Sequence, residues 1–311
     1  MTLYEDLKKL EPFKLAFHND ADGIYSASLL NSIFQIKEIE VPPFGEYTSE
    51  VAIDLGKPLK EEWEGICIDH HPDHPTERKY TLYYDECPTG LIIYKHLKDY
   101  IPKDQAWKVV GALSGDGQPE RVPDEIWDMF PILLEERGIL TKSGFKVVTT
   151  AFPLFYFLSS CINAVSRLGF PERAFEIVNN AKGPLDILDN LEVKDALEQF
   201  RSEEELVYKS KPVVETIRNR YLIVKIKPSS SNVDVTSLIA SKIAGENPGK
   251  TVIVINEATG KVSLRGLLAK YVSNKLATRG IKSGGHPGYC GAQIDPKQIN
   301  EFLDIIRSLL V

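Results

Sequence analysis

The first half of the chain alternates short apolar runs with longer segments in which apolar residues recur every three or four positions. A short apolar run is typical of a buried strand, and the longer spacing is typical of a helix with one buried face. Strands are expected at residues 13–17, 50–53 and 66–68, and helices at residues 24–34, 89–100 and 106–113. This alternation predicts βα units and a parallel sheet.

A highly charged stretch at residues 191–218 follows this half. Its apolar residues keep the helical spacing, which favours a long exposed helix interrupted at Pro212. Beyond it we expect strands at 221–226, 251–256 and 261–265, a helix at 235–244, and a serine-rich turn at 228–232. The prediction is an α/β protein: an N-terminal parallel-sheet domain (1–188), a helical linker (189–218) and a smaller α/β C-terminal domain (219–311).

The composition is that of an ordinary globular protein, with 43% hydrophobic and 26% charged residues in 311. Its net charge of -7 argues against coating long nucleic acid by counterion release, but a short anion can still bind in a local cleft. The four cysteines form no C-x-x-C pair, and no run of about 18 apolar residues appears. We therefore expect a reduced, cytoplasmic protein without a membrane span.

The motif HNDADG places His18, Asp20 and Asp22 at alternate positions just after a predicted strand. An extended backbone would project all three side chains the same way. A divalent cation would relieve their mutual repulsion, and carboxylate plus imidazole suits manganese, zinc or iron. A plain turn that begins a helix is the alternative for this motif alone, and it stays open.

Further aspartates and histidines end other apolar runs. Asp54 follows one strand, where alone it could be a turn or cap residue, and Asp69, His70 and His71 end the next. Adjacent side chains diverge, so one histidine should bind a given ion while the other meets substrate, and the aspartate can orient an imidazole. Asp116 adds a carboxylate in a glycine-rich turn.

These motifs share a position in the predicted fold, because nearly all of them directly follow strand-like runs. In an open α/β sheet, ligands gather outside the carboxyl ends of the strands. Four carboxylates and two imidazoles are more than one ion needs. Two ions about 3.5–4 Å apart that share a carboxylate would use them well.

In order and type, the motifs resemble the DHH phosphoesterase superfamily with its C-terminal DHHA1 domain. HNDADG, Asp54 in DLG, DHH at residues 69–71 and Asp116 resemble its four N-terminal motifs, and VSLRG with SGGHPGYCGAQ resembles DHHA1. The superfamily includes RecJ-like exonucleases, nanoRNases, pAp phosphatases, cyclic-dinucleotide phosphodiesterases and family II pyrophosphatases. The short H-x-D-x-D spacing is closer to the RecJ-like pattern, whereas Ser283 replaces one glycine of the GGGH element.

The resemblance implies two divalent cations, manganese or else magnesium or cobalt. It implies that they are held by His18, Asp20, Asp22, Asp54, His70 and Asp116. In this assignment Asp54 bridges the ions, His71 contacts the scissile phosphate or assists proton transfer, and Asp69 supports it from behind. The far end of the substrate would be held by Arg265, Gly284, Gly285 and His286.

The function expected from this resemblance is a two-metal phosphodiesterase or exonuclease that hydrolyses short single-stranded oligonucleotides to mononucleotides. A pAp phosphatase or cyclic-dinucleotide phosphodiesterase is one alternative. Another is a non-catalytic replication scaffold, which should lack several of the ligands present here. A segment around Asn163 and Arg167 resembles a RecJ-like segment that can face nucleic acid, with an ordinary amphipathic helix as the alternative. The oligomeric state stays open, a homodimer being one alternative.

Overall fold

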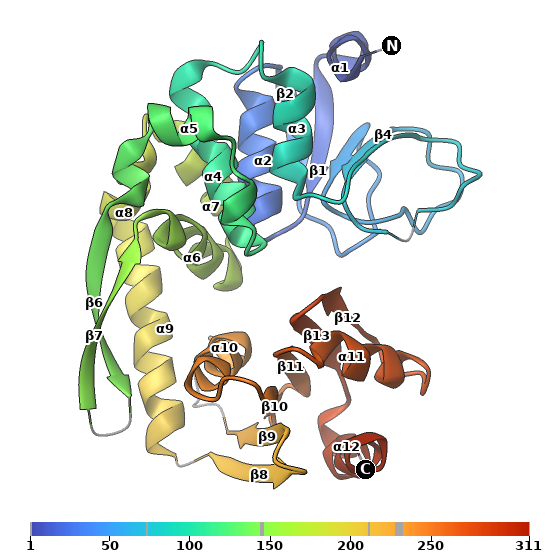
Figure 1. Ribbon diagram of the computed structural model, residues 1–311. Coiled ribbons are helices and arrows are strands. Elements are labelled where there is room, and N and C mark those ends of the chain that lie inside the picture. The colour runs from blue at the N-terminus through green and yellow to red at the C-terminus, as the bar shows by residue number, and fades with distance from the viewer. Residues whose placement is uncertain (1, 73, 144–145, 211, 228–232, 311) are drawn as a thin grey trace. The chain divides into compact units, whose positions relative to one another are not determined.

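The computed structural model describes residues 2–72, 74–143, 146–210, 212–227 and 233–310 (Figure 1). The chain forms two compact units, Met1–Leu197 and Glu198–Val311. The serine-rich turn predicted at residues 228–232 lies outside the described residues. The domain boundaries predicted at residues 188 and 218 stay predictions.

The first unit contains a five-stranded parallel sheet with the strand order β2-β1-β3-β4-β5. Its strands are β1 (Phe13–Phe17), β2 (Ile36–Glu40), β3 (Val51–Ile53), β4 (Ile66–Asp69) and β5 (Thr81–Tyr84). The three central strands are almost wholly buried, as their apolar sequences predict. The predicted parallel sheet is therefore confirmed. The edge strands β2 and β5 are partly exposed and carry too little apolar pattern to be recognised from sequence.

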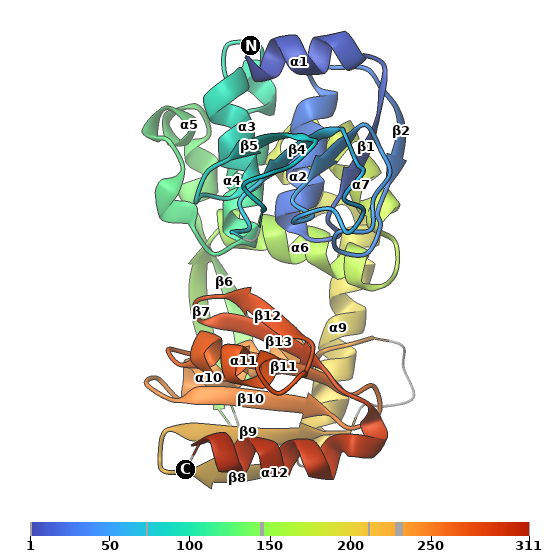
Figure 2. The same ribbon diagram turned by 90° about the vertical axis from the view of Figure 1, so that its right-hand side faces the viewer.

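Helices cover one face of this sheet, as the strands in front of α2 and α4 in Figure 2 show. They include α2 (Ala21–Asn31), α3 (Thr89–Leu97), α4 (Trp107–Gly115), α6 (Phe155–Arg167) and α7 (Pro171–Asn180). Around them lie α1 (Leu3–Leu10), α5 (Asp124–Met129), α8 (Pro184–Asp189), three short 3₁₀ helices and the antiparallel hairpin β6 (Glu136–Ser143) and β7 (Lys146–Pro153). Nearly every residue of α2 is buried, because the sheet and other helices surround it.

Loops cover part of the sheet's other face. Ala16 and Ala52 pack there against Tyr47, Leu55 and Trp63, which lie in the loops that precede and follow β3. The Tyr47 hydroxyl donates a hydrogen bond to the Gly56 carbonyl at 2.8 Å. This anchoring fixes the loops beside the carboxyl ends of β1 and β3.

The charged stretch forms a helix, α9 (Leu191–Lys209), that is shorter than predicted. The expectation of helix up to residue 218 is wrong at its end, where β8 (Val213–Ile217) begins. Pro212 has no backbone N–H for a helix, and the β-branched Val213 and Val214 after it favour a strand.

The second unit is built on a six-stranded mixed sheet with the order β12-β13-β11-β10-β9-β8. Its remaining elements are β9 (Tyr221–Ile226), α10 (Thr236–Glu246), β10 (Thr251–Asn256), β11 (Lys261–Arg265), α11 (Ala269–Ala277), β12 (Ser283–His286), β13 (Tyr289–Gln293) and α12 (Ile299–Leu310), with a 3₁₀ turn before α12. The strands predicted in this half are present. The glycine-rich segment that resembles the GGGH element forms the strand β12, which pairs in a hairpin with β13.

One helix-packing constraint gives a stability prediction. An added Cβ at Gly111 would lie 2.6 Å from the ring of Tyr25, whose hydroxyl is fixed on the Leu158 carbonyl. Gly111→Ala should therefore lower the free energy of unfolding by about 1–3 kcal/mol, measured by denaturant titration. The matched control is Gly245→Ala, where a Cβ meets no described atom within 4 Å and no loss is expected. Equal effects of both substitutions would contradict this account.

Candidate metal centre

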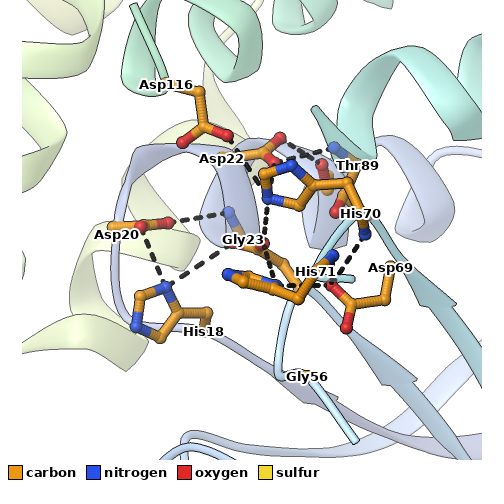
Figure 3. Close-up of polar contacts among 12 residues, drawn as sticks. His18, Asp20, Asp22, Gly23, Gly56, Asp69, His70, His71, Thr89 and Asp116 are labelled. Carbon is orange, nitrogen blue, oxygen red and sulfur yellow. Dashed lines mark hydrogen bonds and ion pairs between the residues drawn. The ribbon is translucent and has the colours of Figure 1, made fainter. Parts of the chain in front are cut away.

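Four chain segments bring the predicted ligands together at the carboxyl edge of the parallel sheet (Figure 3). His18 follows β1, Asp54 follows β3, and Asp69 ends β4, while Asp116 follows the last turn of α4. Because the strands are parallel, their carboxyl ends meet at one edge. All six predicted ligands gather in one cluster: His18, Asp20, Asp22, Asp54, His70 and Asp116.

Asp20 begins helix α2 and contacts His18. One of its carboxylate oxygens accepts a hydrogen bond from the Gly23 N–H at 3.1 Å, and the other lies 2.9 Å from His18 Nδ1. A Cβ at Gly23 would come within 2.3 Å of the His18 carbonyl oxygen, so this turn requires glycine. The alternative interpretation of this motif, a turn that begins a helix, is therefore correct for the backbone here, because Asp20 caps α2. Asp22 lies within the helix and not on the extended segment that we expected.

The carboxylate of Asp22 is buried and held by the start of α3. It accepts hydrogen bonds from the Thr89 N–H at 2.7 Å, the Gly90 N–H at 3.0 Å and the Ser26 hydroxyl at 3.1 Å. Burial and the nearby Asp54 carboxylate nevertheless raise the pKa of Asp22 to about 7. Charge repulsion and burial therefore outweigh three favourable hydrogen bonds.

Asp54 stands at the centre of the cluster. Its Oδ2 lies 3.6 Å from His18 Nδ1, and its Oδ1 lies 3.1 Å from His70 Nε2. Its backbone has a φ of 58°, in the left-handed region that side chains other than glycine rarely adopt. The two oxygens of one buried carboxylate thus face two different groups of ligand atoms.

Asp116 completes the second of these groups. Its Oδ2 is buried, lies 3.3 Å from His70 Nε2, and receives no hydrogen bond from any residue that the structure describes. Burial and the carboxylates of Asp22 and Asp54 raise the pKa of Asp116 well above its usual value. A buried carboxylate oxygen without a hydrogen-bond donor is energetically costly, and a bound cation would supply the missing partner.

His70 lies between the carboxylates of the second group. Although burial alone would lower it, the hydrogen bond and charge of Asp54 raise the pKa of His70 to about 10. A protonated His70 therefore balances negative charge in the metal-free protein. A histidine must be neutral to bind a metal, so cation binding has to displace this proton.

The donors form two groups suited to divalent cations. Within each group, one atom per residue lies within 4.8 Å of the others: His18, Asp20 and Asp54 in one, and Asp22, His70 and Asp116 in the other. Imidazole and carboxylate donors without a thiolate suit manganese or iron. The residues present therefore fit bound divalent cations.

Asp69 lies behind His71 and is itself held by His74. Its Oδ1 lies 2.7 Å from His71 Nδ1, and its Oδ2 lies 2.7 Å from His74 Nε2. Burial of Asp69 is outweighed by the hydrogen bonds from both histidines, which hold its pKa well below the usual value. On the far side, His74 Nδ1 lies 2.7 Å from the Tyr80 hydroxyl.

Sequence reasoning missed the role of His74 and Tyr80. The only signal was a third histidine shortly after the DHH motif, and no pattern linked it to a tyrosine six positions on. The link depends on the loop that returns from β4 to β5.

In the second unit, the predicted substrate-binding residues lie at one end of the sheet. Arg265 ends β11 and is paired with Tyr289 of β13, which is paired in turn with His286 of β12. The Arg265 guanidinium donates to Ser241 Oγ at 3.0 Å, and Gly285 has a φ of 132° that favours glycine. Gly284 has open space beside its Cα, and the side chain of His286 lies outside the described part.

Helix α6 contacts the first motif. The Ser166 hydroxyl donates a hydrogen bond to the carbonyl of Asn19, between His18 and Asp20. One turn earlier, Asn163 Oδ1 is buried without a hydrogen bond from the described residues, while Arg167 is exposed. The helix around Asn163 thus packs beside the candidate site.

One comparison with known proteins matches the C-terminal part of the chain, and others match nearly the whole chain. The model of the DHHA1 domain family matches residues 218–311. A structure of RecJ from Thermus thermophilus in complex with Mn2+ superposes with a TM-score of 0.68 at 15% identity, over 99% of this chain and 53% of that one. Residues 218–311 therefore match the DHHA1 domain family, and the chain as a whole shares the fold of RecJ. The resemblance drawn from the motifs, and the two-domain α/β fold it implied, are confirmed.

Two further solved structures superpose over nearly their whole length. The pGpG-specific phosphodiesterase PggH from Vibrio cholerae has a TM-score of 0.56 at 14% identity, covering 96% of this chain and 98% of that chain. CDC45 from Entamoeba histolytica has a TM-score of 0.52 at 10% identity, covering 98% and 96%. This chain spans only about half of the Thermus RecJ chain. No curated protein sequence matches it significantly.

None of the described helices combines the length and the apolar character needed to cross a bilayer.

The protonation of this centre predicts how its metal affinity depends on pH. Folding raises the pKa of Asp22 to about 7, so its carboxyl binds a proton more tightly in the folded state than in the unfolded state. The metal-free protein therefore loses stability as the pH rises to and through about 7. We expect Mn2+ to bind with release of protons, with affinity falling at least about tenfold between pH 7 and pH 6. Calorimetry in two buffers of different ionisation enthalpy measures this release. Affinity independent of pH would contradict it.

The contact between His74 and Tyr80 predicts energetic coupling. Tyr80→Phe and His74→Asn should each lower the free energy of unfolding by about 1 kcal/mol or more, and the double variant should lose less than their sum. The control is Tyr83→Phe on β5, which removes a tyrosine hydroxyl hydrogen bond of the same length, donated to the Asp6 carboxylate at 2.7 Å, and should be additive with His74→Asn. Additive effects in the Tyr80 cycle would show that the contact contributes nothing.

Proposed function

We propose that this protein is a metal-dependent phosphodiesterase that hydrolyses short single-stranded oligonucleotides to mononucleotides. The two ligand groups would hold two divalent cations, manganese with magnesium or cobalt as substitutes, and Asp54 would serve both groups. The observation that carries the proposal is the position of that carboxylate, whose two oxygens face His18 on one side and His70 on the other. Two ions sharing a carboxylate suit in-line displacement at phosphorus.

The chain's own residues supply orientation and proton handling. When bound, paired cations lower the pKa of water and stabilise the charge that develops on the phosphoryl oxygens. Asp69 Oδ1 accepts a hydrogen bond from the His71 Nδ1–H at 2.7 Å and so fixes the ring's orientation and tautomer. The other ring nitrogen, Nε2, then contacts the scissile phosphate or carries a proton to the leaving oxygen.

In this proposal the DHHA1 domain holds the far end of the substrate. Arg265 offers a planar fork for a phosphate, and the backbone at Gly284 is open to close approach by an anion. Asn163 and Arg167 on α6 are further candidates for contact with the nucleotide. The net charge of -7 favours short substrates over long duplexes.

Two alternatives have support from similar structures. The fold of PggH, a pGpG-specific phosphodiesterase, supports small nucleotide substrates, among which pAp and cyclic dinucleotides remain candidates. The fold of CDC45 keeps the scaffold alternative open. Against a scaffold stands the complete set of metal ligands, gathered in one cluster in this chain.

The test is manganese-dependent hydrolysis with a labelled substrate panel. Wild type should release mononucleotides from dimers and short oligomers faster than it hydrolyses pAp, c-di-AMP or pyrophosphate, with labels at either end giving the direction of attack. Asp54→Ala should lower kcat by at least about a hundredfold, because the carboxylate whose two oxygens face both ligand groups is lost.

The matched control is Asp189→Ala, which removes an exposed aspartate paired with Lys194 and should leave turnover unchanged. Unchanged turnover in Asp54→Ala would remove the proposed centre. Metal-free protein that gains no activity with any of the three cations would favour the scaffold.

A further inference from the structure

An aromatic side chain, Phe44, lies beside two histidines of the candidate metal centre. The ring of Phe44 lies 4.8 Å from the His71 ring and 6.1 Å from the His18 ring, centroid to centroid, and is nearly perpendicular to both. It is 48% exposed, so about half of its surface is open to a ligand. Phe44 thus touches a predicted metal ligand and the histidine proposed to meet the scissile phosphate.

The surrounding loop fixes this ring in place. A Cβ at Gly56, two residues after Asp54, would come within 2.2 Å of the Phe44 ring, so the glycine makes room for it. Gly45, which follows Phe44 in the chain, has a φ of 76°. Its N–H donates a hydrogen bond to the Leu55 carbonyl at 2.9 Å, and its carbonyl accepts one from the Leu59 N–H at 2.9 Å. The ring is therefore held ready before any ligand arrives, which lowers the entropic cost of binding.

A half-exposed aromatic ring beside the proposed phosphate-binding centre suits one class of ligand. Nucleobases stack on aromatic side chains, and this interaction tolerates any base because every base has a π-face. A base is joined to its phosphate through a single sugar, so a nucleotide with its phosphate at His71 brings a base within reach of Phe44. Phosphate chains without bases gain nothing from the ring.

We propose that Phe44 forms a base-stacking subsite for the nucleotide whose phosphate lies at the metal centre. This inference rests on the proposed function and names its substrate as an unpaired nucleotide of any base. A hydrocarbon ring makes no hydrogen bond to a base edge, so it does not select sequence. It selects single strands, because a base stacked within a duplex has no free face.

The test compares nucleotides with a sugar phosphate that lacks a base. Calorimetry with Mn2+ present measures the affinities of 5′-AMP, 3′-AMP and ribose 5-phosphate. Wild type should bind at least one AMP about tenfold more tightly than ribose 5-phosphate, as expected for one stacked base. Phe44→Ala should abolish this ratio without weakening ribose 5-phosphate, and Phe44→Trp should keep it. The control is Phe170→Ala, another exposed phenylalanine, which should change nothing.

The outcomes separate this inference from the proposed function. A ratio near one in wild type, or a ratio that persists in Phe44→Ala, overturns the stacking subsite even if oligonucleotides are hydrolysed. A ratio that depends on Phe44 supports the subsite even if no hydrolysis is found. In an active enzyme, Phe44→Ala should raise KM about tenfold for a dinucleotide and leave it unchanged for the abasic analogue. A fall in kcat on both substrates with KM unchanged would instead assign Phe44 to packing of His71.

Discussion

The structure depends on negative charge concentrated at one edge of a sheet. Asp54 lies between two groups of imidazole and carboxylate donors, with Asp22 and Asp116 buried beside it. Burial and mutual repulsion raise the pKa of Asp22 and Asp116, and a strongly basic His70 balances only part of the charge. Bound cations would relieve this repulsion, and stability, proton release and metal binding would then be coupled in one site.

Three of the acids in the centre are each held by a separate part of the chain. The start of α2 binds Asp20, the N–H groups at the start of α3 bind Asp22, and His74 binds Asp69. Such support fixes the orientation of side chains that contact metal or substrate. The loop that carries Phe44 is anchored on the residues after Asp54, so the proposed catalytic and base-binding groups share one rigid frame.

Sequence reasoning succeeded where one physical rule connects a sequence pattern with a position in the fold. The apolar runs before His18, Asp54 and Asp69 predict buried parallel strands, and parallel strands bring their carboxyl ends together. It failed where structure depends on loops or weak pattern: the strands β2, β5 and β8, the hairpin β12–β13, and the contact from His74 to Tyr80. The role of Phe44 was likewise hidden, because one aromatic residue in a loop carries no periodic signal. The domain boundaries and the roles assigned to the site residues stay predictions.

The central claim is that two cations share the carboxylate of Asp54. The most direct measurement is electron paramagnetic resonance of the full chain titrated with Mn2+. The account predicts two bound ions per chain and the spectrum of a spin-coupled pair, which should become that of isolated ions in Asp54→Asn. A wild-type protein that binds one ion or none, or two without coupling, would contradict it.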